Sequence, residues 1–549
     1  MTCDDSPLIN KFRLEDRTLL LCDVSTRVHS GRDIGSKILI MARYFAPRNE
    51  DQINKIRTNS RSKKAFITRY ILNTTTIIDD DRLKRMEFGD KDESKPHKTI
   101  LLVGETGVGK STLINAMVNY MLGVESKDRI WVEIVETKEK QTDSQTHAVT
   151  VYDVFIDHSW FSLTAIDTPG FGSTEGIEED LSIAESLHEL FKSKDGVHEI
   201  DAVCLVMSSS TTRLSDRQLY IFDAVLSLFG NDVEENIVVL ITHASTKPTN
   251  AIKAIKQANV VCAKTDKGEP VYFRFNNCHC EDFDDGEIFH DYMVAWDQFN
   301  TFMQAFLAFT NERPSVSLKR TEIVLKRRKQ LTASVNNIKE RITVAELKQI
   351  ELKKTEAFLQ QLDTEKKINE KFIKECMVDE PYKEKVPIES NWWNFGSKEA
   401  TCCSVCEENC HYPGCWWVRD LSRCSVMSEG KCTVCTGKCP YSDHVKEDKI
   451  YVVKTRRVKK TLEELKRKYE NTSETVKSII SRLKSDKEEQ ERQKVKLVEE
   501  CYQCVMTLGT IALKSDSVSI IQHMDFLIEK VKETGRPERV KRLEEIKKR

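Results

Sequence analysis

A glycine-rich segment near residue 104 has residue types that could bind phosphate. The sequence there is Gly104-Glu105-Thr106-Gly107-Val108-Gly109-Lys110-Ser111-Thr112, which fits the pattern G-x-x-x-x-G-K-[ST]. Glycines let backbone N–H groups close around the phosphates, the lysine reaches the β- and γ-phosphates, and the hydroxyl ligates Mg²⁺. We therefore predict that these nine residues bind a nucleotide, with Lys110 in the catalytic set and Ser111 on Mg²⁺.

Two later segments could complete a Mg²⁺ and γ-phosphate site. Asp167-Thr168-Pro169-Gly170 has the form Asp-x-x-Gly, so Asp167 is expected to hold Mg²⁺ through water and the Gly170 N–H to contact the γ-phosphate. Thr146, just before a predicted strand, is expected to close onto Mg²⁺, with Thr142 as the alternative. A simple turn and an ordinary polar loop are the competing interpretations.

A second group of residues suggests metal chemistry. Nine of the 18 cysteines fall between residues 402 and 439, in two Cys-x-x-Cys hooks that are each followed by further Cys and His. Such hooks are typical of zinc sites, because two thiolates wrap one tetrahedral ion. The predicted zinc ligands are Cys403, Cys406, Cys410, His411, Cys415, Cys424, Cys432, Cys435, Cys439 and His444, whereas Cys402 is dispensable.

The cysteine module has more ligands than two closed four-ligand sites need. We expect two structural sites, one anchored by Cys403 and Cys406 and the other by Cys432 and Cys435, with the remaining pairing left open. A disulfide knot is the alternative, and a reducing compartment disfavours it. A RING-type ligase is another, but Cys410 follows Cys406 after only three residues, which is too short a spacing for that module.

The elements that must position these residues follow from hydrophobic patterns. Short β-branched runs at 99–103, 149–155, 164–166, 202–207, 237–242 and 271–275 alternate with helical stretches. This alternation predicts an α/β domain with a mainly parallel sheet. Apolar residues at heptad spacing, from Leu331 to Ala345 and from Leu462 to Leu483, predict two coiled-coil arms, joined as an antiparallel hairpin with the cysteine module at its tip.

The predicted organisation therefore has five parts. Residues 1–95 have no assigned role, 96–312 form the P-loop domain, 313–378 a helical arm, 390–450 the Cys/His-rich module, and 451–549 the returning arm and C-terminal helices. The basic run Lys454–Lys460 is interpreted as the solvated start of that returning helix, and Gly535-Arg536-Pro537 as a helix break.

Composition limits the partners and the compartment. Lys and Arg total 85 against 87 Asp and Glu, a formal net charge of −2, which argues against a bulk nucleic-acid binder. No apolar run approaches the ~18 residues of a membrane span, and the polar N-terminus does not resemble a secretory signal. We expect a cytoplasmic protein without a transmembrane segment.

The residues expected to contact the base depart from the usual guanine pocket. In place of Asn-Lys-x-Asp the chain has Thr242-His243-Ala244-Ser245, so Ser245 stands where an aspartate would bind guanine. Asn276 and Asn277 follow the next predicted strand, where a second base-contacting loop is expected. An ATP-binding P-loop protein therefore remains an alternative.

The set GETGVGKS, DTPG, THAS and FNN resembles the AIG1/GIMAP and chloroplast Toc group of septin-related GTPases, over about 40% of the chain. The resemblance implies that His243 packs against guanine and that Asn277 or Asn276 hydrogen-bonds it, with GTP or GDP and Mg²⁺ as ligands. It also implies dimerisation or higher assembly across the nucleotide face.

The position after Asp-x-x-Gly is Phe171, whose side chain cannot orient an attacking water. We therefore predict a slow GTPase, in which GTP hydrolysis controls dimerisation or assembly and the metal-tipped arm contacts a protein partner. The alternatives are a coiled-coil scaffold with structural nucleotide, and the ATP-binding protein named above.

Overall fold

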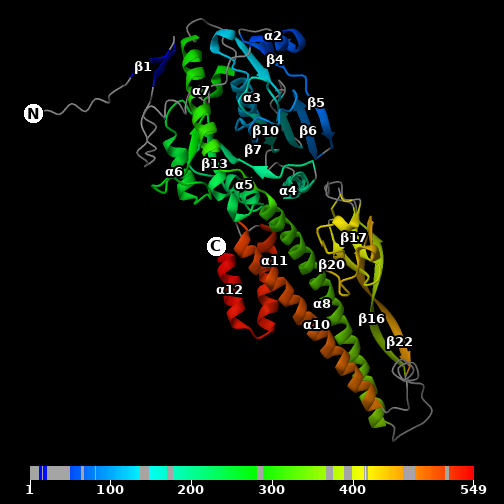
Figure 1. The fold of residues 1–549 in the computed structure, drawn as a ribbon. Helices are drawn as coiled ribbons and strands as arrows, with labels where there is room; N and C mark the ends of the chain where they lie inside the picture. Colours follow the sequence, from blue (N-terminus) through cyan, green and yellow to red (C-terminus); the bar gives the residue numbers. More distant parts are fainter. Residues whose placement is uncertain are drawn as a thin grey trace, which may run out of the picture.

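The structure is a computed structural model of the 549-residue chain. It describes residues 11–14, 17–20, 50–63, 67–80, 82–135, 148–169, 177–193, 195–280, 289–365, 375–388, 399–412, 414–415, 418, 420–461, 476–513 and 518–548. An α/β domain lies at one end of the molecule, and a pair of long helices extends from it with a small β-rich module alongside (Figure 1).

The α/β domain is built on a mostly parallel sheet, as the sequence predicts. Its eight strands run in the order β14 (Tyr272–Arg274), β13 (Ile237–Thr242), β12 (Ala202–Ser208), β7 (His97–Val103), β10 (Ser162–Asp167), β9 (Val149–Val154), β6 (Leu83–Phe88) and β5 (Thr75–Asp79). The pairs β9–β10 and β5–β6 are antiparallel, and the other pairs are parallel. All six strands predicted from β-branched runs are present.

Helices cover both faces of this sheet. Along β7, Ile100 and Leu102 enter one apolar core while Leu101 and Val103 enter the other, because successive side chains of a strand point to opposite faces. The first core is closed by α3 (Lys110–Met121) and α7 (Phe289–Glu312), and the second by α4 (Ile177–Lys192), α5 (Asp216–Leu226) and α6 (Thr249–Gln257).

The N-terminal region, whose role the sequence left open, contributes to this domain. Strands β5 and β6 form one edge of the main sheet, and Ile53 and Ile56 of α2 (Glu50–Asn59) enter the first core. A second, three-stranded sheet pairs β3 (Arg61–Lys63), β4 (Thr68–Ile71) and β8 (Ile130–Glu133). A hairpin of β1 (Lys11–Leu14) and β2 (Arg17–Leu20) precedes them.

A buried ion pair fastens the start of the central strand β7. Lys98 Nζ lies 3.0 Å from Asp201 Oδ1 and also donates to the Thr310 carbonyl at 3.0 Å, while Thr99 N donates to Asp201 Oδ2 at 2.8 Å. Both charged side chains are less than 10% exposed. Removing one partner of such a pair leaves the other charge buried and unpaired.

Lys98→Met is therefore expected to lower the free energy of unfolding of the α/β domain by about 3 kcal/mol, measured by thermal unfolding monitored in that domain. Lys84→Met is the matched control, since Lys84 pairs with Asp79 at the surface and such pairs contribute less than about 1 kcal/mol. Equal losses of unfolding free energy in the two variants would contradict the view that the buried Lys98–Asp201 pair stabilises the domain more than a surface pair does.

Two long helices form the arm. Helix α8 (Lys319–Glu365) lies beside α10 (Val476–Ile511), and α11 (Val518–Glu533) and α12 (Pro537–Lys548) fold back along them (Figure 1). The predicted first seam is confirmed in its main positions: Leu331, Val335, Ile338 and Ile342 share one apolar core with α10 and α11. The second seam was predicted between residues 462 and 483. The side chains at its heptad positions lie outside those that the structure describes.

The end of α11 and the start of α12 confirm the predicted break. Gly535 has φ +71° there, a left-handed conformation that favours glycine.

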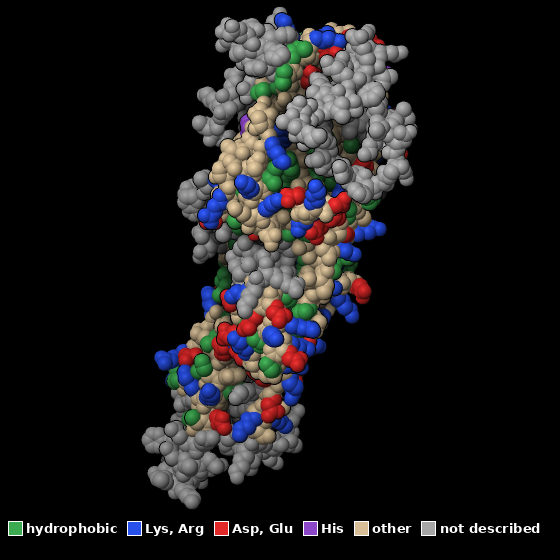
Figure 2. Space-filling model, turned by 90° about the vertical axis from the view of Figure 1, so that its left-hand side faces the viewer, with side chains coloured by type: hydrophobic (Ala, Val, Ile, Leu, Met, Phe, Trp, Pro, Cys, Tyr) green, Lys and Arg blue, Asp and Glu red, His purple; other side chains and the backbone are tan. Residues whose placement is uncertain are grey.

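Lys and Arg side chains are interspersed with Asp and Glu over the arm (Figure 2), as expected for solvated helix faces. In the part of the chain that the structure describes, no helix is long and apolar enough to cross a membrane.

The connection between the arm helices differs from the prediction. Lys454–Lys460 was expected to begin a helix, but it belongs to β22 (Lys449–Thr461), which pairs antiparallel with β16 (Glu375–Pro387) over their full length. The helix prediction was wrong because β22 contains β-branched residues such as Ile450, Val452 and Val458 among its basic ones, and β-branched residues favour an extended strand.

The cysteine module also lies elsewhere than predicted. Its strands are β17 (Ala400–Cys403), β18 (Glu408–His411), β19 (Met427–Ser428), β20 (Lys431–Cys432) and β21 (His444–Glu447). The β16–β22 ribbon carries it back along α8, so it packs beside the α/β domain and not at the tip of a helical hairpin (Figure 1). Two side chains of α8 hydrogen-bond to the module: Gln330 Nε2 donates to the Ser425 carbonyl at 3.2 Å, and Asn337 Nδ2 donates to Glu408 Oε2 at 3.0 Å.

Candidate functional site

The predicted phosphate loop lies between β7 and α3, where a strand, a turn and a helix N-terminus meet. Gly104 must be small, because a Cβ there would lie 2.4 Å from the Val206 carbonyl oxygen. Gly109 caps α3 with φ +92°, a left-handed conformation that the turn requires. Backbone N–H groups and the positive end of the helix dipole therefore face the same space, which suits an anion.

Lys110 and Ser111 begin α3 beside the end of β10. The Lys110 ammonium is buried, and it donates to the carbonyl oxygens of Gly104 at 2.9 Å and Glu105 at 3.0 Å. Burial lowers the pKa of Lys110, against the opposing effect of Asp167 and Glu105. Ser111 Oγ donates to Asp167 Oδ2 at 3.1 Å. The structure thus brings together a cation for phosphate and two oxygens of the kind that Mg²⁺ binds.

Two threonines that the sequence analysis did not single out hold this loop in place. Thr242 Oγ1 donates to the Val108 carbonyl at 2.8 Å, and Thr168 Oγ1 donates to the Leu102 carbonyl at 2.9 Å. Both lie within quoted motifs, since Thr242 is the first residue of Thr242-His243-Ala244-Ser245 and Thr168 follows Asp167 in Asp-x-x-Gly. Their positions at the ends of parallel strands are the signal that could have identified them.

The two predicted base loops are adjacent. Ala244 N donates to the Phe275 carbonyl at 3.0 Å, so His243 and Asn276 lie on neighbouring loops. His243 is exposed and has φ +51°, which a non-glycine residue rarely adopts. Asn277 begins a short 3₁₀ turn, and its Oδ1 is buried without a hydrogen-bond partner among the described residues. That orphan acceptor suits a ligand with an N–H group.

A hollow of about 340 Å³ opens next to His243. Its walls are formed by Ser209 and by the stretch from His243 to Asn250, which includes Ser245. Ser209 Oγ donates to the His243 carbonyl at 2.6 Å and so helps to fix the loop. Four residues from the predictions, Thr142, Thr146, Gly170 and Phe171, lie outside the described residues.

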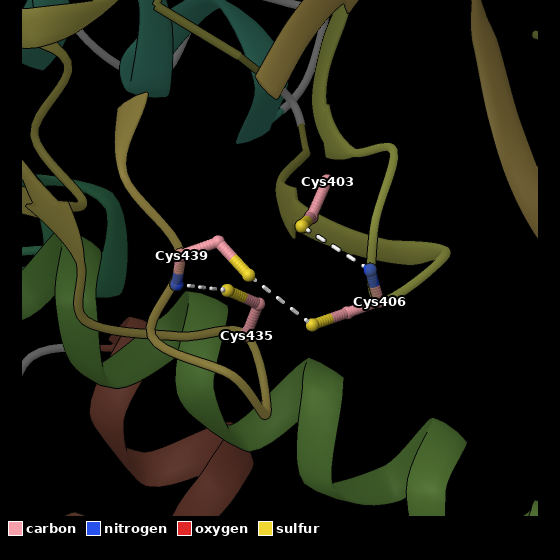
Figure 3. A group of neighbouring side chains, drawn as sticks. All are labelled: Cys403, Cys406, Cys435 and Cys439. Atoms are coloured by element: carbon pink, nitrogen blue, oxygen red, sulfur yellow. Dashed lines mark hydrogen bonds between the residues drawn. The ribbon is translucent and has the colours of Figure 1, made fainter. Parts of the chain in front are cut away.

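All ten predicted zinc ligands fall into three groups of side chains. The first holds Cys403, Cys406, Cys435 and Cys439, whose sulfurs all lie within 4.8 Å of one another and face a common space (Figure 3). The Cys406 and Cys439 sulfurs are 3.6 Å apart, close to the edge of about 3.8 Å that four Zn–S bonds of ~2.3 Å would give a tetrahedron. The first group therefore fits a tetrahedral zinc ion.

The second group shares a member with the first. It contains Cys410, Cys432, Cys435 and His444, again with all ligand atoms within 4.8 Å. Hydrogen bonds from Cys410 and then Cys432 lower the pKa of Cys435. Burial lowers the pKa of His444, but its bonds to Cys432 and Cys435 outweigh burial and raise that pKa to about 10.

This shared thiol corrects the expectation of two separate sites. Two four-ligand sites would need eight residues, but the first two groups contain seven, because Cys435 lies between them. A thiolate has enough lone pairs to bridge two ions, and the charge of two cations offsets the repulsion between so many thiolates. Cys402 belongs to none of the groups.

A third group comprises His411, Cys415 and Cys424. His411 Nδ1 lies 3.2 Å from Cys424 Sγ and 3.6 Å from Cys415 Sγ. An ion with Zn–N of ~2.0 Å and Zn–S of ~2.3 Å would place such atoms about 3.5 Å apart. Three protein ligands leave one tetrahedral position to be filled.

Comparison with known proteins identifies the α/β domain. Residues 98–258 match the model of the AIG1 family. The chain is 27% identical to a translocase of chloroplast 34 homolog from Chlamydomonas reinhardtii over 188 residues, 33% of this chain and 44% of that protein. It is 29% identical to immune-associated nucleotide-binding protein 4 of Arabidopsis thaliana over 149 residues, 27% of this chain and 40% of that protein. The chain thus spans less than half of the length of either relative.

Solved structures of Toc33 from Arabidopsis thaliana also match. The complex of Toc33 with GDP and Mg²⁺ is 17% identical, with a TM-score of 0.29, over 41% of this chain and 90% of that one. The arm and the cysteine module lie outside the matched family model. Residues 98–258 of this chain are therefore an AIG1-family domain, related to the Toc34 and immune-associated nucleotide-binding proteins.

Proposed function

We propose that the AIG1-family domain binds GTP and GDP with Mg²⁺ in the loop from Gly104 to Thr112. The observation that carries this proposal is the junction of β7, α3 and β10, where the Lys110 ammonium is held in the loop and Ser111 lies 3.1 Å from Asp167. When bound, Mg²⁺ would offset phosphate charge, with Ser111, Asp167 through water and Thr146 as the residues proposed to hold it.

His243, Asn276 and Asn277 are the proposed base-binding residues. Support comes from the contact between their two loops, from the hollow beside His243 and from the buried, unpartnered Asn277 Oδ1. The Asn277 acceptor suits a base with an N–H at its edge, which guanine has at N1 and N2 and adenine has at N6. Ser245 in place of the usual aspartate keeps ATP as the competing ligand.

The proposed output is assembly and not rapid turnover. Phe171 follows Asp-x-x-Gly, so the chain has no polar side chain there to orient water. We infer slow hydrolysis, below about one turnover per minute in dilute monomer, and dimerisation or higher assembly through the nucleotide face. The arm and module would then contact a protein partner. A scaffold with structural nucleotide is the second candidate, since the arm and module extend far beyond the matched domain.

One experiment separates these functions. Titration calorimetry with Mg²⁺ should show tighter binding of GTP and GDP than of ATP, and light scattering should show a larger mass with one guanine nucleotide than with the other. Tighter ATP binding would assign the site to the ATP-binding alternative. Equal mass with GTP, GDP and no nucleotide would leave the scaffold as the function.

A further inference from the structure

The third metal group lies where the cysteine module meets the AIG1-family domain. Cys424 follows Arg423, whose carbonyl accepts a hydrogen bond from Lys192 Nζ at 2.7 Å. Lys192 is the last residue of α4, and α4 is the first described helix after Asp167. The loop that carries a ligand of the third group is therefore bonded directly to the nucleotide-binding domain.

The same face of α4 carries a buried histidine. His188 precedes Lys192 by four residues, and residues at that spacing lie one above the other on a helix. His188 is only 1% exposed. Burial lowers its pKa well below the usual value; the charges of Lys329, Lys192 and His411 lower it further, whereas the charge of Cys415 opposes the shift. A neutral imidazole therefore lies within electrostatic reach of two members of the third group.

We propose that His188 of α4 is the fourth ligand of a zinc ion held by His411, Cys415 and Cys424, and that this ion joins the nucleotide-binding domain to the cysteine module. The coordination would be Cys₂His₂, a common closed set for structural zinc. It would also explain why a histidine is buried at a contact between two parts of the chain.

Other side chains near the group are poorer ligands. Ser425 Oγ lies 3.4 Å from Cys415 Sγ, and Thr401 Oγ1 lies 4.0 Å from Cys424 Sγ. Neutral hydroxyls are not among the usual zinc ligands, which are thiolate, imidazole and carboxylate. His188 is not among the atoms that lie within 4.8 Å of one another, so the proposed coordination requires the imidazole and the other three ligands to draw together on metal binding.

Helix α8 supports the contact from a second side. Gln330 Nε2 donates to the Ser425 carbonyl at 3.2 Å, and Ala333 packs in the core of the cysteine module. Leu318, just before this helix, and Leu325, in its second turn, pack in the core that also holds Leu187 of α4. Helices α4 and α8 thus meet the segment from Arg423 to Ser425, and an ion there would fix all three together.

The test counts metal ions in the full-length reduced protein reconstituted with Zn²⁺ or Co²⁺. We expect three ions per chain in the wild type and two in His188→Ala, with an equal loss in Cys424→Ser. His158→Ala is the matched control, because His158 is exposed on the turn between β9 and β10, and it should keep three ions.

A second variant separates ligation from folding. His188→Cys should keep three Co²⁺ ions and strengthen the thiolate-to-cobalt absorption, because a third thiolate then binds the ion. Hydrogen exchange in α4 should slow on metal addition in the wild type and stay unchanged in His188→Ala. Three ions and an unaltered cobalt spectrum in His188→Ala, with loss in Cys424→Ser, would overturn the proposal in favour of water as the fourth ligand.

Discussion

Cys435→Ser is expected to remove two metal ions from each chain, whereas Cys406→Ser removes one. Cys435 belongs to both the first and the second ligand group, while Cys406 belongs only to the first. A serine hydroxyl is a poor replacement for a bridging thiolate. Each structural zinc contributes on the order of 10 kcal/mol of binding free energy that only the folded site can use, so the module should also unfold at lower temperature.

The measurement is metal content by elemental analysis of reduced protein, together with thermal unfolding of the cysteine module. Cys402→Ser is the matched control, because Cys402 is as buried as Cys435 and precedes the predicted ligand Cys403 but belongs to no group. The control should keep its full metal content. If Cys435→Ser and Cys406→Ser lose the same number of ions, the prediction that the Cys435 thiolate is shared by two ions is wrong.

Lys110→Ala should weaken GTP binding by about 100-fold. A hydrogen bond to a charged group contributes about 1.5–3 kcal/mol, and the ammonium is predicted to contact two phosphates, so a loss near 3 kcal/mol follows. The Lys110 side chain is buried in the phosphate loop, where it donates hydrogen bonds to the carbonyls of Gly104 and Glu105. Calorimetric titration of GTP with Mg²⁺ measures the effect.

Lys267→Ala serves as the control for the charge change, because Lys267 is exposed beside the Gly268 turn. Its GTP affinity should stay within twofold of the wild type. Ser111→Ala should keep part of the affinity but lose its dependence on Mg²⁺, since only the hydroxyl beside Asp167 is removed. Unchanged affinity in a folded Lys110→Ala variant would refute the assigned phosphate loop.

Local patterns in the sequence were enough to predict the parts whose geometry is set by consecutive residues. A phosphate loop is a single turn between a strand and a helix, so its glycines, Lys110 and Ser111 already specify it. The six strands were recognisable because β-branched runs bury both faces of a parallel sheet. The first coiled-coil seam followed from heptad spacing, and Leu331, Val335 and Ile338 do pack there.

The path of the chain through space decided the rest. β6 joins the sheet by pairing with β9, a partner far along the chain that no local pattern names, and β5 pairs with β6 at the edge. The ribbon of β16 and β22 turns the cysteine module back along α8, which heptad spacing alone could not indicate. Strand pairing between distant segments depends on loops whose closure costs entropy but leaves no periodic mark.

The metal ligands show the same division most clearly. Residue types and the two hooks were sufficient to predict all ten side chains that the structure gathers into candidate metal groups, because thiolate and imidazole are what zinc binds. The grouping of these side chains could not be predicted from the sequence. Cys403 and Cys410 lie beside Cys435 only after β17, β18 and β21 have paired. The sequence by itself determined which atoms can bind metal. The tertiary structure decided that one sulfur belongs to two groups and that the loop carrying Cys424 contacts α4, because distances across a fold are set by packing and not by spacing along the chain.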